Sequence, residues 1–173
     1  RVVLVRHNSY LFKGTVEENL KMAKPDATKE EMEAVLQKVN LLGFLQTQDG
    51  LQTQLLEKAS NLSGGQCQRL VIARALLKED SKVYIFDEAA SNIDVESEEL
   101  IMNVIHNLAK TKTVLLISHR LANVVKSDKI YFLKDGEIKE SGKHEELMSQ
   151  NGAYRHLYES QMALENYGKG GVA

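Results

Sequence analysis

Tryptophan is absent from the 173-residue chain, and proline and cysteine occur once each, as Pro25 and Cys67. A single cysteine excludes an internal disulfide and is typical of a reduced, cytosolic protein. Net charge is small too, because 22 lysines and arginines stand against 24 aspartates and glutamates, for a formal charge of −2. This balance argues against binding to nucleic acid or to an anionic membrane surface.

Long apolar runs and a leader sequence are also missing. Apolar runs such as Val2–Val5 and Val114–Ile117 are far shorter than the about 20 residues that cross a bilayer. No charged leader precedes a long apolar stretch, so we expect no signal peptide. The chain begins at Arg1 without a methionine, and we interpret it as a piece of a longer protein that starts inside a strand. The residues present, 43% hydrophobic and 27% charged, are typical of a soluble globular domain.

The apolar pattern predicts alternating helices and strands. Thr28 and Glu31 have the spacing of a capping box, and apolar residues follow them at helical intervals. Continuous apolar runs at 82–86 and 113–118 predict parallel strands that are covered on both faces. This order predicts an α/β fold with a mostly parallel sheet. The other expected elements are a strand at 1–5, helices starting at 62–66 and covering 95–109, 144–150 and 153–165, and a hairpin of 130–133 with 137–140.

Polar residues follow two of the expected strands. Asp87 and Glu88 end the first strand, and Ser118-His119-Arg120 ends the second. Ligands of open α/β sheets bind outside the carboxyl ends of the strands. Asp87 is therefore a candidate to orient a hydrated Mg²⁺ ion, and Glu88 a candidate to accept a proton from water. Two alternatives stay open: the carboxylates only cap a strand, and His119 is a structural histidine.

The segment Ser63-Gly64-Gly65-Gln66 opens an expected helix. Ser63 and Gln66 have the spacing of a capping box. Unpaired amides and the positive end of the helix dipole favour a phosphate at such a position. The two glycines remove side chains that would keep an anion at a distance. A plain helix cap without a ligand is the alternative.

Taken together, these segments resemble the ATP-binding-cassette (ABC) ATPases. Leu62–Gln66 reads LSGGQ, which is the signature motif of that family residue for residue. Val83–Glu88 resembles the Walker B strand with its catalytic glutamate, Ser91–Asp94 resembles the D-loop, and His119 resembles the switch histidine. The resemblance covers roughly residues 2–147. Within it, Tyr10–Leu20 is similar to the exporter subgroup, in which this stretch contacts the membrane domain.

The resemblance implies that two such domains close head to tail around two ATP molecules. Asp87 would hold Mg²⁺ through water, Glu88 would polarise the attacking water, and His119 would contact the γ-phosphate. Asp94 would transmit changes across the dimer interface, together with Ser91 of the D-loop. The residues that would bind the ATP held mainly by the partner domain are Ser63, Gly64, Gly65 and Gln66.

Three features depart from the family pattern. The Walker A loop, G-x-x-x-x-G-K-[ST], does not occur in the chain, and the near match at Gly136–His144 has the wrong spacing and lacks the final hydroxyl. We expect that loop to precede Arg1 in the complete domain. His7 occupies the position at which the family has its Q-loop glutamine. A histidine side chain can titrate, and its length differs from that of glutamine. Ala89-Ala90 replaces the usual Pro-Thr after the carboxylates.

The predicted organisation is one partial P-loop NTPase domain of the ABC ATPase type over 1–165, followed by a flexible tail over 166–173. Within it, about 15–80 would form the helical signature subdomain and about 81–147 the Walker B, D-loop and H-loop part of the catalytic core. Without the Walker A strand and loop, we expect weak or no ATP binding, exposed apolar surface on the sheet and an unpaired edge.

The predicted function is that of the ATP-hydrolysing domain of an export-type ABC transporter, at the cytoplasmic face of the plasma membrane. Its expected cofactors are ATP and Mg²⁺, and its expected partners are a second ABC ATPase domain and a transmembrane domain, with no nucleic acid. Two alternatives stay open: a soluble ABC ATPase that remodels a ribosome or DNA, and a regulatory half of a heteromeric exporter that binds ATP without hydrolysing it. The transported substrate is chosen by the membrane domain and cannot be read from this segment.

Overall fold

A computed structural model describes residues 1–170 of the chain. The chain divides into two compact units, residues 1–117 and residues 118–173. The subdivision that we predicted near residue 80 falls inside the first unit and stays a prediction.

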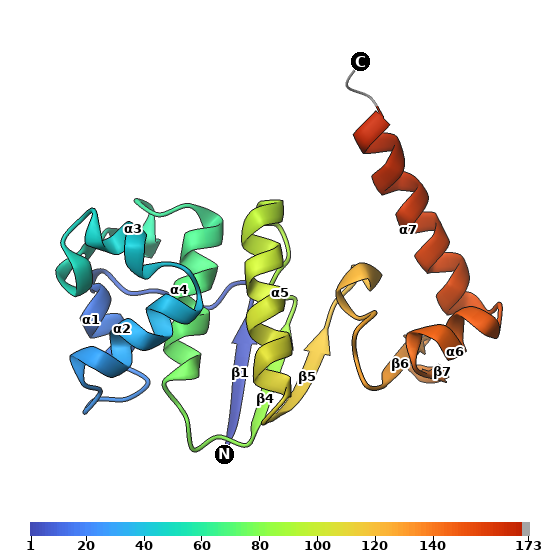
Figure 1. The fold of residues 1–173 in the computed structure, drawn as a ribbon, viewed down its shortest axis with the longest axis horizontal. Helices are drawn as coiled ribbons and strands as arrows, with labels where there is room; N and C mark the ends of the chain where they lie inside the picture. The colour runs from blue at the N-terminus through green and yellow to red at the C-terminus, as the bar shows by residue number, and fades with distance from the viewer. Residues whose placement is uncertain (171–173) are drawn as a thin grey trace. The chain divides into compact units, whose positions relative to one another are not determined.

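The first unit is built on a parallel sheet of three strands in the order β1-β4-β5 (Figure 1). The strands are β1 (Val2–Arg6), β4 (Val83–Asp87) and β5 (Thr113–Ile117). All three run in the same direction, which confirms the predicted α/β fold with a mostly parallel sheet. Their carboxyl ends therefore meet at one edge, where any ligand of an open α/β sheet binds.

Helices α4 (Gly64–Leu76) and α5 (Val95–Ala109) cover one face of this sheet. Inward-facing residues of β1 and β4, such as Val5 and Phe86, are buried beneath them. The opposite face is apolar and open, which corrects our expectation that the strands are covered on both faces. The open face also confirms the expected exposed apolar surface. Four of its apolar side chains expose between 44% and 61% of their area: Val2, Leu4, Leu115 and Ile117.

Short helices pack beside α4 in the first unit. The helix predicted from Thr28 is present, since the Thr28 hydroxyl accepts from the amide of Glu31 at 3.2 Å. Thr15 and Glu18 form a second capping box of the same kind, in a stretch where we had expected no helix. The elements of this region are β2 (Gly14–Thr15), α1 (Val16–Lys21), α2 (Lys29–Lys38), α3 (Leu42–Gln46), η1 (Gly50–Gln52), β3 (Gln54–Leu55) and η2 (Glu57–Ala59).

The second unit holds the predicted hairpin and two helices. Strands β6 (Ile130–Lys134) and β7 (Glu137–Gly142) pair antiparallel, and Asp135 and Gly136 both take positive φ at their turn. A 3-10 turn, η3 (Leu121–Asn123), precedes the hairpin, and α6 (His144–Ser149) and α7 (Ala153–Gly170) follow it. Tyr154 is the buried anchor of α7, and burial raises the pKa of its hydroxyl to about 12.

The flexible tail predicted over 166–173 is corrected for residues 166–170, because α7 continues to Gly170. A helix already formed by the preceding residues extends at little cost, so the glycines near its end do not stop it. Residues 171–173 lie outside the described residues. Within residues 1–170, no helix combines the length and apolar character that a bilayer span requires.

Candidate nucleotide site

The signature turn, Ser63–Gln66, starts α4 as a complete capping box. The Ser63 hydroxyl accepts from the amide of Gln66 at 3.1 Å, and the Gln66 side chain accepts from the amide of Ser63 at 2.9 Å. Ser63 and Gly64 are exposed on the surface of the first unit. The first intrahelical bond runs from the amide of Cys67 to the carbonyl of Ser63, so the amides of Gly64 and Gly65 precede it. Gly64 is exposed, so the turn presents its amide at the surface, as an anion site requires, whereas Gly65 is buried.

The two glycines of the signature turn have different surroundings. A methyl group built on Gly64 would meet nothing within 4 Å, whereas one built on Gly65 would lie 2.2 Å from Ser97 Oγ and 2.6 Å from Asp94 Oδ1. Gly64 therefore leaves open space in front of the turn. Gly65 instead allows the signature turn to touch the start of α5. This refines the expectation that both glycines serve the approach of an anion.

Asp87 and Glu88 lie at the carboxyl end of β4, in the middle of the three-stranded sheet. Asp87 is paired in register with Arg6 of β1 and Ile117 of β5. Its carboxylate lies 4.0 Å from Nε of Arg6, and both side chains are partly exposed to solvent. The carboxylate is therefore available to a ligand outside the sheet edge.

Glu88 turns the chain sharply at this edge. It has a φ of 52°, a left-handed conformation that costs a non-glycine residue about 1–2 kcal/mol. Its amide donates to the carbonyl of Ile117 at 3.0 Å. Its own carbonyl accepts from the amide of Ser91 at 3.1 Å and from the Ser91 hydroxyl at 2.9 Å. The strained backbone is thus held in place from both sides, which is a common arrangement at functional sites.

Asp94 is the N-cap of α5. Its carboxylate accepts from the amide of Ser97 at 2.9 Å, and this bond, together with one from the Ser97 side chain, holds the pKa of Asp94 below its usual range. Because the other oxygen faces Gly65, the D-loop and the signature turn lie against each other. The structure therefore brings two predicted motifs together that are about thirty residues apart in the sequence.

His7 follows β1 and is exposed at the same edge of the sheet. Sequence reasoning missed the residue that holds this segment. Gln68 is buried in α4, and its side-chain amide donates to the carbonyl of Arg6 at 3.2 Å. The available signal was a polar residue at a core position of a helix, which is uncommon unless the residue has a partner.

His119, the predicted switch histidine, belongs to the second unit and is exposed. Its carbonyl accepts from the side-chain amide of Gln161 at 2.8 Å. Its predicted contact with the γ-phosphate stays a prediction.

The chemistry of the donor set fits a magnesium ion that is bound with a nucleotide. Residues 1–170 contain no cluster of three or more histidine, cysteine or acidic side chains that could coordinate a metal ion. Mg²⁺ keeps several waters and takes one or two carboxylates together with substrate phosphates. Asp87, partly exposed beside an open sheet edge, is suited to that role.

Cys67 and Arg69, which lie next to the signature turn, serve packing rather than chemistry. Burial raises the pKa of the Cys67 thiol, which disfavours the reactive thiolate. Arg69 donates to the carbonyl of Asn40 at 2.8 Å and so ties α4 to the end of α2. Arg69 also donates to the carbonyls of Gly65 and Val39, each at 3.4 Å.

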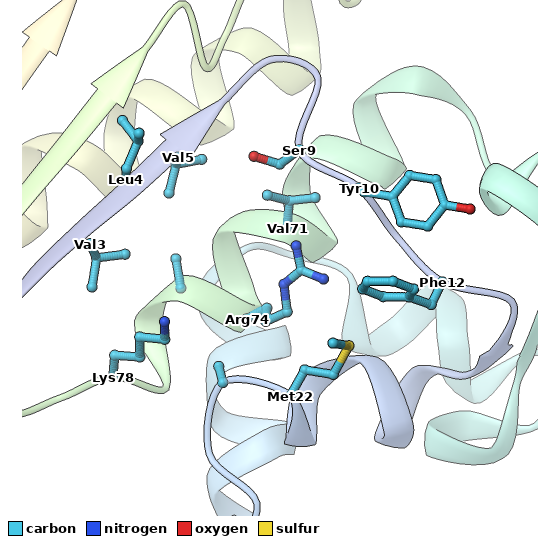
Figure 2. Close-up of a pocket in the computed structure, with 12 residues that line it drawn as sticks. Val3, Leu4, Val5, Ser9, Tyr10, Phe12, Met22, Val71, Arg74 and Lys78 are labelled. Carbon is cyan, nitrogen blue, oxygen red and sulfur yellow. The ribbon is translucent and has the colours of Figure 1, made fainter.

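A groove of about 370 Å³ lies between β1, α1 and α4 in the first unit. Figure 2 shows Tyr10, Phe12 and Met22 along one side of it, with the guanidinium of Arg74 beside them. These three apolar side chains are exposed by 49%, 44% and 58% of their area. The rings of Tyr10 and Phe12 pack edge to face at 4.8 Å between centroids.

Asn19 holds the aromatic side of this groove in shape. It is buried, it accepts from the amide of Phe12 at 2.8 Å, and it donates to the Phe12 carbonyl at 2.9 Å. The same side-chain amide donates to the carbonyl of Thr15 at 3.0 Å. The segment identified by its exporter-like sequence is therefore held by hydrogen bonds and has an apolar rim.

An exposed signature turn, a carboxylate pair at the end of a parallel strand and a D-loop against the turn are features of the ATP-binding-cassette class of fold. Residues 1–91 match the sequence profile of the ABC transporter family. The chain belongs to the ABC transporter family, and its fold is that of part of an ABC ATPase domain.

Similar proteins support this conclusion over nearly the whole chain. An ABC transporter ATP-binding protein of Haemophilus influenzae is 53% identical over 165 residues, which are 95% of this chain and 29% of that protein. A Staphylococcus aureus relative named for multidrug export, an ATP-binding/permease protein, is 40% identical over 162 residues, 93% of this chain and 28% of its own length. A bacterial Atm1-family ABC exporter solved with ATP bound has a TM-score of 0.84 at 30% identity, covering 92% of this chain and 28% of that one. This chain thus spans less than a third of the length of these relatives.

Proposed function

We propose that the chain is part of the ATP-hydrolysing domain of an ABC exporter. One observation carries the proposal: the exposed signature turn of α4 and the Asp87-Glu88 pair belong to one compact unit, in which the D-loop lies against the turn. The exporter names of its relatives support the same function. The test is hydrolysis of Mg-ATP by the complete protein, which we expect to depend on Glu88.

In this proposal the carboxylates act on water and metal. Asp87 would hold Mg²⁺ through a water molecule, and the bound ion would supply positive charge that offsets the charge of the phosphates. The Glu88 carboxylate accepts a proton from the water that attacks the γ-phosphate. The braced turn at Glu88 supports this role, because a general base must hold its position while the water moves.

The signature turn binds the ATP that is held mainly by a second ABC domain. The free amides at Gly64 and Gly65 donate to the terminal phosphate, and Ser63 and Gln66 contribute side-chain hydrogen bonds to phosphate or ribose. Asp94 and Ser91 of the D-loop then relay the closed state of one site to the other, since Asp94 caps α5 and touches the turn.

His119 and His7 complete the proposed site. His119 donates to the γ-phosphate and steadies the charge of the transition state. His7 stands at the Q-loop position, and Gln68 fixes the carbonyl that precedes it. The imidazole of His7 would thus stand between the nucleotide site and the segment Tyr10–Leu20, which leads into the groove.

The proposed partners are a second ABC ATPase domain and a transmembrane domain at the cytoplasmic face of the plasma membrane, with no nucleic acid. We place the transmembrane domain on the groove lined by Tyr10, Phe12 and Met22. Its apolar rim and basic floor suit a short amphipathic helix with an acidic end. Burial lowers the pKa of Arg74 because it disfavours the charged guanidinium, and an acidic group of the partner would offset that cost.

Charge placed on the groove rim is expected to uncouple transport. Phe12→Glu together with Met22→Glu should lower substrate transport by the complete exporter about tenfold or more, because the apolar contact with the membrane domain is lost. Transport into membrane vesicles and protection of the junction from proteolysis measure the effect. Leu56→Glu is the matched control, since Leu56 is 53% exposed but lies outside the groove. Equal transport by both variants would place the membrane domain elsewhere.

The 173-residue chain alone is expected to bind Mg-ATP weakly or not at all. The loop that cradles the phosphates, G-x-x-x-x-G-K-[ST], is not in its sequence, and the signature turn supplies only a few donors. Isothermal titration with Mg-ATP is the measurement. A dissociation constant in the micromolar range would show that the chain binds the nucleotide through residues we have not assigned.

A further inference from the structure

Gln161 of α7 holds the backbone on both sides of Arg120. Its side-chain oxygen accepts from the amide of Leu121 at 2.9 Å, and its side-chain nitrogen donates to the carbonyl of His119 at 2.8 Å. The two bonds join residues that are 40 and 42 positions apart in the sequence. We call this pair of hydrogen bonds the Gln161 clamp. It uses both the donor and the acceptor of the side-chain amide, so no apolar residue could replace it.

The backbone that the clamp holds lies between two regular elements. Residues 118–120 follow β5 and precede η3. Ser118 shapes this stretch locally, because its hydroxyl accepts from the amide of Arg120 at 3.1 Å. Arg120 is the N-cap of η3 but makes no side-chain capping hydrogen bond, and the amide of Leu121 is capped from α7 instead. The turn is therefore formed by its own residues but is held in place by α7.

A second contact joins the same turn to α7. Glu165 lies four positions after Gln161, so both side chains stand on one face of the helix. The Nε atom of Arg120 donates to Oε1 of Glu165 at 2.9 Å. Both partners of this ion pair are partly exposed, and an exposed pair contributes little stability. The Gln161 clamp is therefore the contact to test.

The first turn of α7 is anchored, which gives the clamp a fixed base. Figure 1 shows α7 starting beside α6 and β7. There the amide of the buried Tyr154 donates to Glu140 at 3.0 Å, and its hydroxyl lies 2.8 Å from Nδ1 of His144. The Tyr154 ring also packs edge to face on Phe132, with 6.3 Å between centroids. Gln161 follows seven residues later, which is about two helical turns, so it stands on the same side of α7.

The clamp acts on the backbone of His119 and not on its imidazole. It uses only the carbonyl of this residue, and the side chain is exposed. Fixing the backbone leaves only the side-chain torsions to determine where the imidazole stands, and these take a few staggered states. A group held in this way by its neighbours reaches its working position at a lower entropic cost.

We propose that Gln161 is a positioning residue for ATP hydrolysis, which sets the place of the His119 imidazole by clamping the adjacent backbone to α7. The inference rests on the proposed function, in which His119 contacts the γ-phosphate, and it adds α7 to the residues on which the reaction depends. A misplacement of about 1 Å can cost a reaction about 10²-fold in rate. The loss should appear in kcat, because His119 would act on charge that develops in the transition state.

Gln161→Met in the complete transporter is the first test. Methionine has nearly the same length and shape as glutamine but makes neither bond of the clamp. We expect kcat for Mg-ATP to fall about 10- to 100-fold while KM changes less than about twofold. Gln150→Met is the matched control, since it is the same change at an exposed residue of the same unit, and it should alter neither constant. Equal hydrolysis by the two variants overturns the proposal.

The same change in a protein that already carries His119→Ala separates positioning from a general loss of structure. Gln161→Met should then lower kcat no further, because the residue that the clamp positions has been removed. A fall by the same factor with and without His119 overturns the proposal. If Gln161→Met does not fold, the same cycle is run with Gln161→Glu, which keeps an acceptor for Leu121 but cannot donate to the carbonyl of His119.

The His119→Ala variant alone distinguishes failure of this inference from failure of the proposed function. Normal hydrolysis by His119→Ala would remove His119 from the proposed site, and the role of Gln161 with it. Slow hydrolysis by His119→Ala together with normal hydrolysis by Gln161→Met would overturn only the positioning role and leave the proposed function in place.

Discussion

Glu88→Gln in the complete transporter is expected to lower the rate of ATP hydrolysis by about 10²- to 10⁴-fold. Glutamine has nearly the same shape as glutamate but cannot accept the proton of the attacking water. The turn that presents Glu88 should survive the change, because it is held by backbone groups, through the bonds to Ile117 and Ser91. Phosphate release at saturating Mg-ATP measures the effect.

Binding of ATP separates this loss of chemistry from a loss of structure. The Glu88→Gln variant should bind Mg-ATP at least as tightly as the unaltered protein, since one negative charge near the phosphates is removed. Glu99→Gln on the exposed surface of α5 is the control for the loss of one charge, and it should hydrolyse ATP normally. Unchanged hydrolysis by the Glu88→Gln protein would remove Glu88 from the proposed mechanism, and with it the assignment of this chain to a hydrolysing site.

Gly65→Ala is expected to destabilise the first unit, whereas Gly64→Ala is not. The new methyl group at residue 65 would lie 2.2 Å from Ser97 Oγ and 2.6 Å from Asp94 Oδ1, so α4 and α5 must move apart. Overpacking of this kind lowers the free energy of unfolding by about 1–3 kcal/mol. At residue 64 the methyl group meets open space, and alanine favours the helix over glycine by up to about 1 kcal/mol.

Urea unfolding of the 173-residue chain, followed by circular dichroism, measures both variants. A second change at the contact provides an internal check. Two of the three nearest atoms belong to Ser97, so Ser97→Gly should recover part of the stability that Gly65→Ala removes. If Gly64→Ala proves as destabilising as Gly65→Ala, the contact between the signature turn and α5 is not what requires a glycine.

The local features of the site followed from short stretches of sequence. The capping box of Ser63 and Gln66, the N-cap of α2 at Thr28 and the hairpin at Asp135-Gly136 are each set by neighbours within a few residues. The same rule would have found α1, because Thr15 and Glu18 carry the same capping pattern. The end of α7 was harder to predict from the sequence. Glycines near the end of a helix lower its stability, but they do not fix the residue at which the helix ends.

Contacts between distant residues could not be read in this way. The sequence predicted one anion-binding role for both signature glycines, and only the packing of α4 on α5 separates Gly64 from Gly65. The bond from Gln68 to the carbonyl of Arg6 joins residues 62 positions apart. Likewise, which sheet face is open depends on where the helices pack, and each apolar strand alone would suit cover on both faces.

By itself, the sequence determined the family, the order of helices and strands, and the residue types offered to a nucleotide, because motifs and caps depend on near neighbours. The tertiary structure alone decided the strand order β1-β4-β5, the close approach of Gly65 to Ser97 and the groove beside Phe12. The physical reason is that burial and close contact depend on two surfaces from distant parts of the sequence. These surfaces meet only when the chain folds.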